Sequence, residues 1–382
     1  MVFSSNIFLF GFLPVFLAVY FFLKKDFKNS WLLLASVFFY AWGEPSFVLV
    51  ILGVLVVDFY IVRRIWSDSL ERNRRWLLAL SVTGKLGLLC YYKYSNFFVD
   101  NFNTLLAGIG SDPVDWVKIA LPIGVSFFTF QSISYSVDVY RGTAKPLDSI
   151  RDYLLYILLF PQLIAGPIVR YNDIVEDIAD RDKNETIDNK LAGFYRFVLG
   201  LSKKILIANL LGEQADMLFN APADDLYYAT AWLAAICYTF QIYFDFSGYS
   251  DMAIGIGKMI GFRFPENFDN PYVSRSITEF WRRWHITLGQ FMKDYLYIPL
   301  GGNRGSKAKV YFNLWIVFIA SGFWHGAGWN FIVWGVFHGF FLVMDRVFLN
   351  KFHEKIGKIP SVVFTFFLVI ICLLYTSDAA DD

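Results

Sequence analysis

The stretch Ser-Gly-Phe-Trp-His-Gly-Ala-Gly-Trp-Asn at residues 321–330 places a histidine, His325, inside a run of sequence suited to lipid. From Tyr311 to Met344 the sequence contains no Asp, Glu, Lys or Arg, and its histidines there are His325 and His338. A titratable side chain at membrane depth is costly, so its default interpretation is a functional one. We therefore take His325 as the candidate reactive residue, because a neutral imidazole is the usual general base for a hydroxyl group.

The composition indicates an all-α polytopic membrane protein. Hydrophobic residues make up 56% of the 382 residues and charged residues 18%, whereas about a quarter of a soluble domain is charged. The balance of 34 basic and 33 acidic residues argues against nucleic acid as a partner and leaves the lipid bilayer as the expected one. Cys90, Cys237 and Cys372 are scattered, so the spacing predicts neither a disulfide nor a metal site.

Apolar segments recur along the whole chain without an internal repeat, which predicts one integral-membrane domain over residues 1–371. Several segments are shorter than the ~20 residues a full span needs, so some are expected to be half-helices or re-entrant. Basic loops at 24–28, 63–75 and 141–151 are expected to face the cytoplasm, with the N-terminus outside. The candidate segments are 6–23, 31–42, 47–62, 76–92, 117–139, 153–169, 194–211, 227–246, 250–262, 286–300, 311–344 and 361–375.

Two segments allow more than one interpretation. Residues 170–190 are polar with Ile174 and Ile178 between acids, which fits either a helix at the membrane surface or a solvated loop. Residues 372–382 resemble an in-frame translation of a transposon-end adapter used in sequencing libraries, so we expect them to be foreign to the protein. The alternative for that segment is a short acidic tail.

The run Ser-Ile-Thr-Glu-Phe-Trp-Arg-Arg-Trp-His-Ile-Thr-Leu at 276–288 predicts a helix. Ser276 and Glu279 have the spacing of a capping box, and Glu279 and Arg283 that of an i, i+4 ion pair. His285 would share a face with the tryptophans Trp281 and Trp284 and with Leu288. An interfacial amphipathic helix explains the Trp and Arg residues but not His285, which needs a polar partner.

Glycines 322, 326 and 328 surround His325 and allow close approach of a substrate or of another helix. The alternative to a reactive His325 is therefore a hydrogen-bonded histidine at a helix crossing. Trp324 precedes it in the motif and is a candidate supporting residue. His338 follows Trp334 by four residues, and we expect it to pack or to support His325.

Two further groups are weaker candidates. Asp245 and Asp251 interrupt apolar segments, and we expect them to cap half-helices, to orient a histidine or to line a polar path. The glycine-rich loop at 300–309 carries Arg304, Lys307 and Lys309, which are candidate contacts to donor phosphates; a basic membrane-surface loop is the alternative. The sequence has no metal-ligand spacing, dinucleotide fingerprint or Ser-His-Asp signature, so we expect neither a metal nor a bound cofactor.

In combination these motifs resemble the membrane-bound O-acyltransferase family, and within it the subgroup that O-acetylates bacterial polysaccharides of the alginate type. The blocks that carry the resemblance span nearly all of residues 1–345. They are MVFSSNIFLF, LPIGVSFFTFQSISYSVDVYRG, FPQLIAGPIVRY, YFDFSGYSDMAIGIG, ENFDNPY, SITEFWRRWHITL, DYLYIPLGGNRG and SGFWHGAGWNFIVWGVFHG.

The resemblance implies a helical bundle around a tunnel in the bacterial inner membrane. The family's catalytic histidine corresponds to His325 of Trp-His-Gly, and its second recurring histidine to His285 of Arg-Trp-His. A cytoplasmic acyl thioester, acetyl-CoA, would be the donor, and an exported polysaccharide or a periplasmic acetyl-accepting protein the acceptor. Members of this subgroup usually extend beyond 382 residues, which agrees with a native sequence that continues.

Three other hypotheses remain open from the sequence. The first is D-alanyl transfer to teichoic acid by a related member of the family. The second is an ion or solute transporter, which the missing internal repeat disfavours. The third is a non-catalytic scaffold in an export complex.

Overall fold

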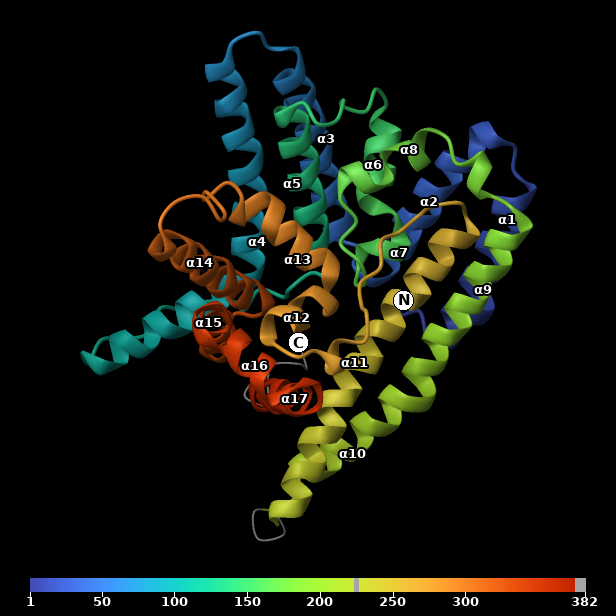
Figure 1. Ribbon diagram of the computed structural model, residues 1–382. Helices are drawn as coiled ribbons and strands as arrows, with labels where there is room; N and C mark the ends of the chain where they lie inside the picture. The colour runs from blue at the N-terminus through green and yellow to red at the C-terminus, as the bar shows by residue number, and fades with distance from the viewer. Residues whose placement is uncertain (223–226, 375–382) are drawn as a thin grey trace.

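The protein is helical throughout the part that the computed structural model describes, residues 1–222 and 227–374, where it contains no strand (Figure 1). The first half contains α1 (Leu13–Phe22), α2 (Lys25–Gly43), α3 (Phe47–Ser67), α4 (Glu71–Gly108), α5 (Val125–Arg141), α6 (Ile150–Leu158), α7 (Phe160–Leu163) and α8 (Tyr171–Ala179). The second half contains α9 (Ile187–Ser202), α10 (Asn209–Phe219), α11 (Tyr228–Met259), α12 (Ile277–Arg283), α13 (Ile286–Met292), α14 (Lys307–His325), α15 (Trp329–Met344), α16 (Asn350–Ile356) and α17 (Lys358–Leu374). Short π-helical or 3-10 segments are η1 (Ile7–Phe12), η2 (Asp182–Asn184), η3 (Lys203–Ala208), η5 (Pro271–Val273), η6 (Lys293–Tyr297) and η7 (Asp345–Leu349).

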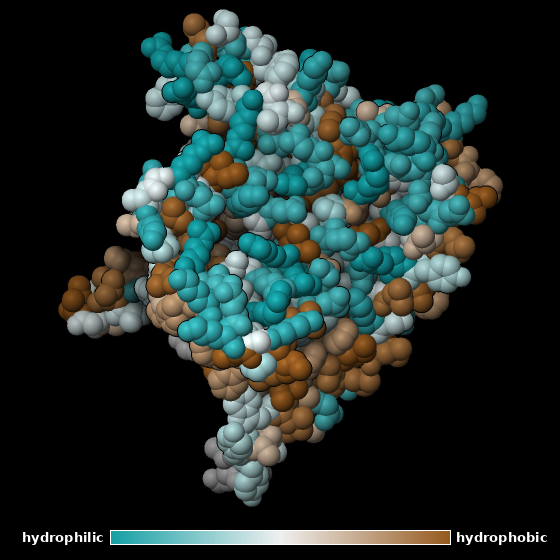
Figure 2. All heavy atoms as spheres, viewed as in Figure 1, coloured by the Kyte–Doolittle hydropathy of each residue, from teal (hydrophilic) through white to brown (hydrophobic). Residues whose placement is uncertain are grey.

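The outer surface carries many large apolar side chains. Phe22, Val117 and Phe10 are 92%, 86% and 80% exposed. Figure 2 shows a polar face toward the viewer, with hydrophobic surface along its lower and right-hand margins. By length and composition, one continuous helical stretch in the described residues, Trp329–Ile356, is long and apolar enough to cross a bilayer; Ile7–Phe22 and Lys358–Leu374 are apolar but shorter. Apolar surface on this scale indicates a face that contacts lipid rather than water.

The structure differs from the expected segmentation in several places. The segments 227–246 and 250–262 form one continuous helix, α11. Asp245 and Asp251, on either side of the expected break, pair with side chains of the neighbouring α9 and η3. The segment 311–344 is instead two helices, separated at residues 326–328. In the polar segment 170–190, a helix begins at Tyr171, and Ile174 and Ile178 are buried against the bundle. The expected domain boundary at residue 371 lies within α17, and residues 375–382 lie outside the described part.

The three basic loops of the first half adjoin one another, because Lys25 and Lys28 share a pocket with Arg151 and the other two loops are hydrogen-bonded together. Arg63 and Arg74 donate to the carbonyls of Asp148 and Tyr140. Arg141 donates to the carbonyl of Asp294 in η6. The glycine-rich loop at 300–309 follows η6 closely, and Arg346 of η7 bonds Asn303 in this loop, so both adjoin the same surface. We call this surface the basic face.

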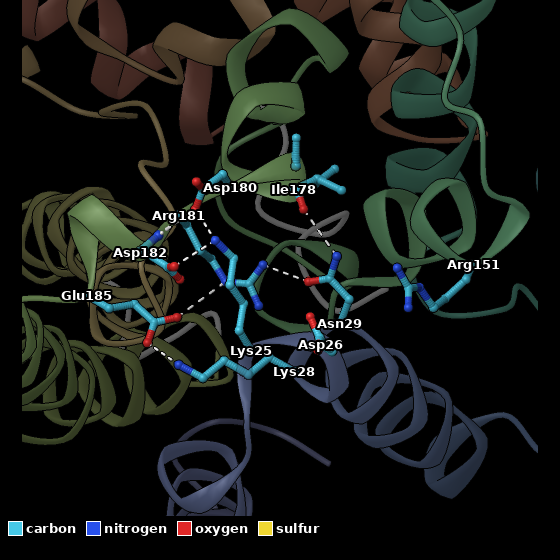
Figure 3. Close-up of a pocket in the computed structure, with 11 residues that line it drawn as sticks. Lys25, Asp26, Lys28, Asn29, Arg151, Ile178, Asp180, Arg181, Asp182 and Glu185 are labelled. Atoms are coloured by element: carbon cyan, nitrogen blue, oxygen red, sulfur yellow. Dashed lines mark hydrogen bonds and ion pairs between the residues drawn. The ribbon is translucent and has the colours of Figure 1, made fainter.

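A pocket on the basic face is occupied by the protein's own ion pairs (Figure 3). Lys25, at the start of α2, lies 2.9 Å from Asp180 and 2.6 Å from Asp182, while Lys28 pairs with Glu185. The backbone amide of Asp182, and then Lys25, lower the pKa of the Asp180 carboxyl below its usual value. These pairs tie the N-terminal helices to the segment after α8.

A second set of charges is fully buried between α3, α4, α5 and α6. Lys85 of α4 lies 2.8 Å from Asp58 of α3, and both side chains are at most 3% exposed. Asp58 also accepts from Ser81 and Tyr153, and Lys85 donates to the carbonyl of Ser132 and to Ser136. Every charge in the cluster has hydrogen-bonding partners, which is the condition for burying an ion pair without a large penalty.

Candidate active site

His325 is the last residue of α14, which turns back into α15 through three residues. The two helices pack through glycines. A Cβ atom added to Gly322 would lie 2.3 Å from the carbonyl oxygen of Phe331, and one added to Gly335 would lie 2.4 Å from that of Phe318. The glycine-rich sequence therefore allows the close helix crossing that the alternative interpretation expected, and His325 lies at its end.

The C-terminal end of α14 is held by α4. The ammonium group of Lys93 donates to the carbonyls of Trp324 and His325, the latter at 3.0 Å. The next residue, Tyr94, donates to the carbonyl of Phe323 at 2.6 Å, and its ring stacks on Phe323 with centroids 4.0 Å apart. The last carbonyls of a helix have no intrahelical donor and carry partial negative charge. The Lys93 ammonium supplies both a hydrogen-bond donor and a positive charge at this end.

Aromatic rings enclose His325. Its imidazole lies 4.7 Å, centroid to centroid, from Trp324 on one side and 4.7 Å from Trp334 on the other. Nε2 of His325 and Nε1 of Trp324 are buried, and neither has a hydrogen-bonding partner among the described residues. Two polar atoms are thus left unsatisfied in one small region.

His285 reaches the same region from a different element, and here the expected helix is wrong in part. The N-cap contact of Ser276 to the amide of Glu279 and the ion pair of Glu279 with Arg283 are present. However, α12 ends at Arg283, Trp284 is extended, and His285 adopts a left-handed conformation (φ 43°) before α13 begins. Non-glycine residues seldom adopt positive φ, and such residues gather at functional sites.

A buried asparagine supplies the polar partner that His285 requires. Nδ1 of His285 lies 3.1 Å from Oδ1 of Asn267, which also accepts from the amide and the hydroxyl of Thr287. Nε2 of His285 is buried and has no partner among the described residues. The His285 ring lies 6.4 Å from that of Trp324, so the Trp324 indole adjoins both imidazoles.

His338 extends the cluster away from this site. Its Nδ1 accepts from the indole N–H of Trp281 at 3.2 Å, and its Nε2 lies 3.2 Å from Sγ of Cys372. Its ring is 4.8 Å from Trp334, which separates it from His325. The positions agree with the expectation that His338 packs behind His325.

Asp245 and Asp251 are in ion pairs within the helical layer of α9, η3 and α11. Asp245 pairs with Lys204, and Asp251 pairs with Arg196 and Lys203. Since α11 is continuous there, the expectation that they cap half-helices is wrong. Asp251 lines the same pocket as Asn267.

The candidate donor contacts Arg304, Lys307 and Lys309 are at the opposite end of α14 from His325. The helix has 19 residues, so about 28 Å separates the two ends. The structure thus does not bring these cations together with the histidines. It places them on the basic face.

Lys93 and Asn267 were missed as site residues. Lys93 is a lysine among aromatic residues in an apolar segment, a placement that itself indicates function at membrane depth. Asn267 gave no local signal, because its role depends on contacts 18 and 20 residues away in sequence. No group of three potential metal ligands occurs within residues 1–222 and 227–374.

Comparison with known proteins agrees with the resemblance seen in the sequence. The chain matches the membrane-bound O-acyltransferase (MBOAT) family over residues 147–374. It is 46% identical to a Pseudomonas aeruginosa protein named "Probable alginate O-acetylase AlgI", over 97% of this chain and 71% of that protein. It is 38% identical to the peptidoglycan O-acetyltransferase of Helicobacter pylori, over 96% of this chain and 75% of that protein. A teichoic acid D-alanyltransferase of Streptococcus thermophilus is 29% identical over 62% of this chain and 61% of that protein. The chain therefore belongs to the membrane-bound O-acyltransferase family and is a polytopic membrane enzyme that transfers acyl groups to oxygen.

Proposed function

We propose that this enzyme moves an acetyl group from a cytoplasmic thioester, acetyl-CoA, to hydroxyl groups of an exported polysaccharide. The acceptor is reached directly or through a periplasmic acetyl-accepting protein, and the enzyme resides in the bacterial inner membrane. The names of two relatives, which specify O-acetylation of alginate and of peptidoglycan, support acetyl as the group and a glycan as the acceptor.

The observation that carries this proposal is the set of three unsatisfied polar atoms on three neighbouring side chains. They are Nε2 of His285, Nε2 of His325 and Nε1 of Trp324, all buried and without partners among the described residues. Each such atom costs about 1–3 kcal/mol, so native structures seldom contain several together without a reason. A thioester carbonyl and a hydroxyl group would supply partners for two of these atoms.

The chemistry requires one base and no covalent enzyme intermediate. Nε2 of His325 takes the proton of the acceptor hydroxyl as its oxygen attacks the thioester carbonyl carbon. The resulting tetrahedral species collapses, the carbon–sulfur bond breaks, and the proton passes from His325 to the sulfur. The acetyl group has then moved from sulfur to oxygen, and His325 is regenerated.

The charge distribution supports entry of the donor from the basic face. Positive loops of membrane proteins favour the cytoplasm, where acetyl-CoA is found. Arg304, Lys307 and Lys309 lie on that face and would contact the donor's phosphates, while the acetyl end extends along α14 toward His325. A tunnel between the helices is the path that this arrangement requires.

The test is donor choice in purified protein reconstituted in proteoliposomes. Acetyl-CoA is supplied alone, with alginate and peptidoglycan fragments as acceptors, and acetyl ester is measured on each glycan. We expect acetylation of one of them. Transfer only with a D-alanyl carrier protein as donor would contradict the proposal and favour D-alanylation, and ion flux without any donor would favour a transporter.

A further inference from the structure

We infer that the indole N–H of Trp324 is the hydrogen-bond donor to the thioester carbonyl oxygen as negative charge develops on it. The inference deepens the proposed acetyl transfer and rests on it. Donation to the carbonyl oxygen would otherwise be expected of His285, the histidine of the Arg-Trp-His motif.

The hydrogen bonds around Asn267 determine which nitrogen of His285 carries the proton. The backbone amide of Thr287 can only donate, so the Asn267 atom that it contacts is the oxygen. The hydroxyl of Thr287 accepts from the amide of Ile168 and donates to the same oxygen. An amide oxygen cannot donate, so Nδ1 of His285 must be protonated to bond to it.

Neutral His285 therefore has a bare lone pair at Nε2, the atom that is buried without a partner. A lone pair repels a carbonyl oxygen and accepts from a hydroxyl group. Neutral His285 is then unsuited to polarise the carbonyl. A donor must come from another side chain.

Trp324 is that donor. An indole N–H donates and never accepts, so an acceptor from the substrate is the group that satisfies it. The indole stacks on Phe130 with centroids 5.2 Å apart and planes 26° apart, and the Lys93 ammonium lies 5.6 Å from the ring centre. The ring is thus held next to both imidazoles, with its N–H buried and unpaired among the described residues.

A fixed donor in a dry site stabilises the oxyanion without reorganisation during the reaction. Removing one such donor typically lowers kcat about 10²–10³-fold. The donor contributes little to binding of the uncharged ground state, so its loss should affect kcat more than KM.

The experiment compares variants of the full chain in the proteoliposome assay with acetyl-CoA and the glycan that the unmodified enzyme acetylates. Trp324→Phe keeps an aromatic ring and removes the N–H. We expect kcat to fall about 100-fold, with KM for acetyl-CoA within about threefold and an unchanged pH profile. Trp334→Phe is the matched control, since Trp334 contacts His325 at the same centroid distance from its other side. It measures the cost of lost packing, and we expect less than about a fivefold loss.

If Trp324→Phe lowers the amount of folded protein, 3-benzothienylalanine at position 324 replaces the N–H by sulfur at nearly constant shape. The same fall in kcat is then expected. Retention of more than half of the original kcat by either variant, while His325→Ala abolishes transfer, would overturn the role of Trp324 and leave the proposed function intact. Undiminished transfer by His325→Ala would instead contradict the proposed function itself.

Discussion

At position 267 a single amide oxygen serves three donors, from the imidazole of His285 and from the amide and hydroxyl of Thr287. The amide nitrogen of Asn267 donates to Ser250 of α11, which anchors the group to the bundle. The left-handed conformation of His285 persists because these bonds, together with that from the Ile286 amide to the Asn267 carbonyl, hold His285 and the two residues after it. Asn267 is therefore a positioning residue.

Asn267→Leu keeps the approximate volume and removes every side-chain hydrogen bond. We expect the free energy of unfolding to fall by about 1–3 kcal/mol, because buried groups of Thr287 and His285 are left unpaired. We also expect kcat to fall more than tenfold in the folded fraction, because His285 loses its orientation. Both are measured in detergent, by thermal unfolding and by acetyl transfer.

The control is Asn313→Leu, which removes a buried amide of α14 that bonds the carbonyl of Gly302 on the basic face. It should lower stability without lowering kcat of the folded protein. An equal loss of kcat in the two variants would show that Asn267 acts through general stability alone.

At the scale of elements, the helical hairpin of α14 and α15 presents His325. Its crossing depends on Gly322 and Gly335, where an added Cβ would lie within 2.4 Å of a backbone oxygen of the other helix. Gly335→Ala should therefore separate the helices and reduce both the yield of folded protein and its activity. Gly339→Ala, one turn further along α15, meets side-chain atoms no closer than 3.4 Å and should be tolerated. Similar thermal stability of the two variants would contradict this packing.

The contact of α4 with the end of α14 is a second feature, at the scale of elements, that positions His325. Lys93→Met keeps the length of the side chain and removes the donor to the carbonyls of Trp324 and His325. We expect a loss of kcat of about 10–100-fold with a small change in KM, because small displacements of catalytic groups are costly.

Lys85→Met on the same helix breaks the buried pair with Asp58, which lies in a different cluster. It should cost about 3–5 kcal/mol of stability and leave kcat of the remaining folded enzyme nearly unchanged. The reverse pattern, with Lys85 governing kcat and Lys93 only stability, would exclude the positioning role of Lys93.

The sequence predicted the features of a helix that depend on local interactions. It did not predict the features that depend on contacts with other parts of the chain. The cap at Ser276 and the ion pair of Glu279 with Arg283 are local, and both are present. The spacing of Trp281, Trp284 and His285 predicted one helix, but tertiary contacts to Asn267 break it between α12 and α13. Local propensity is a weak prior against such contacts.

At the scale of the whole molecule, the sequence indicated a helical membrane protein and a reactive histidine at depth, from composition and from the absence of charge between 311 and 344. It could not indicate that α4 reaches the end of α14, since Lys93 and His325 are 232 residues apart. Nor could it place Arg304, Lys307 and Lys309 at the far end of the helix that bears His325. Separation of these cations from the histidine is compatible with the proposed transfer from one side of the membrane toward the other.

The most direct test of the account replaces His325 by Ala in full-length protein and compares it with His353→Ala, a substitution at another buried histidine, in α16, outside the proposed site. The measurement is the amount of O-acetyl ester on the exported glycan, per enzyme molecule in the membrane. We predict that His325→Ala abolishes acetylation and that His353→Ala retains most of it. Undiminished acetylation by His325→Ala at normal protein levels would contradict the account.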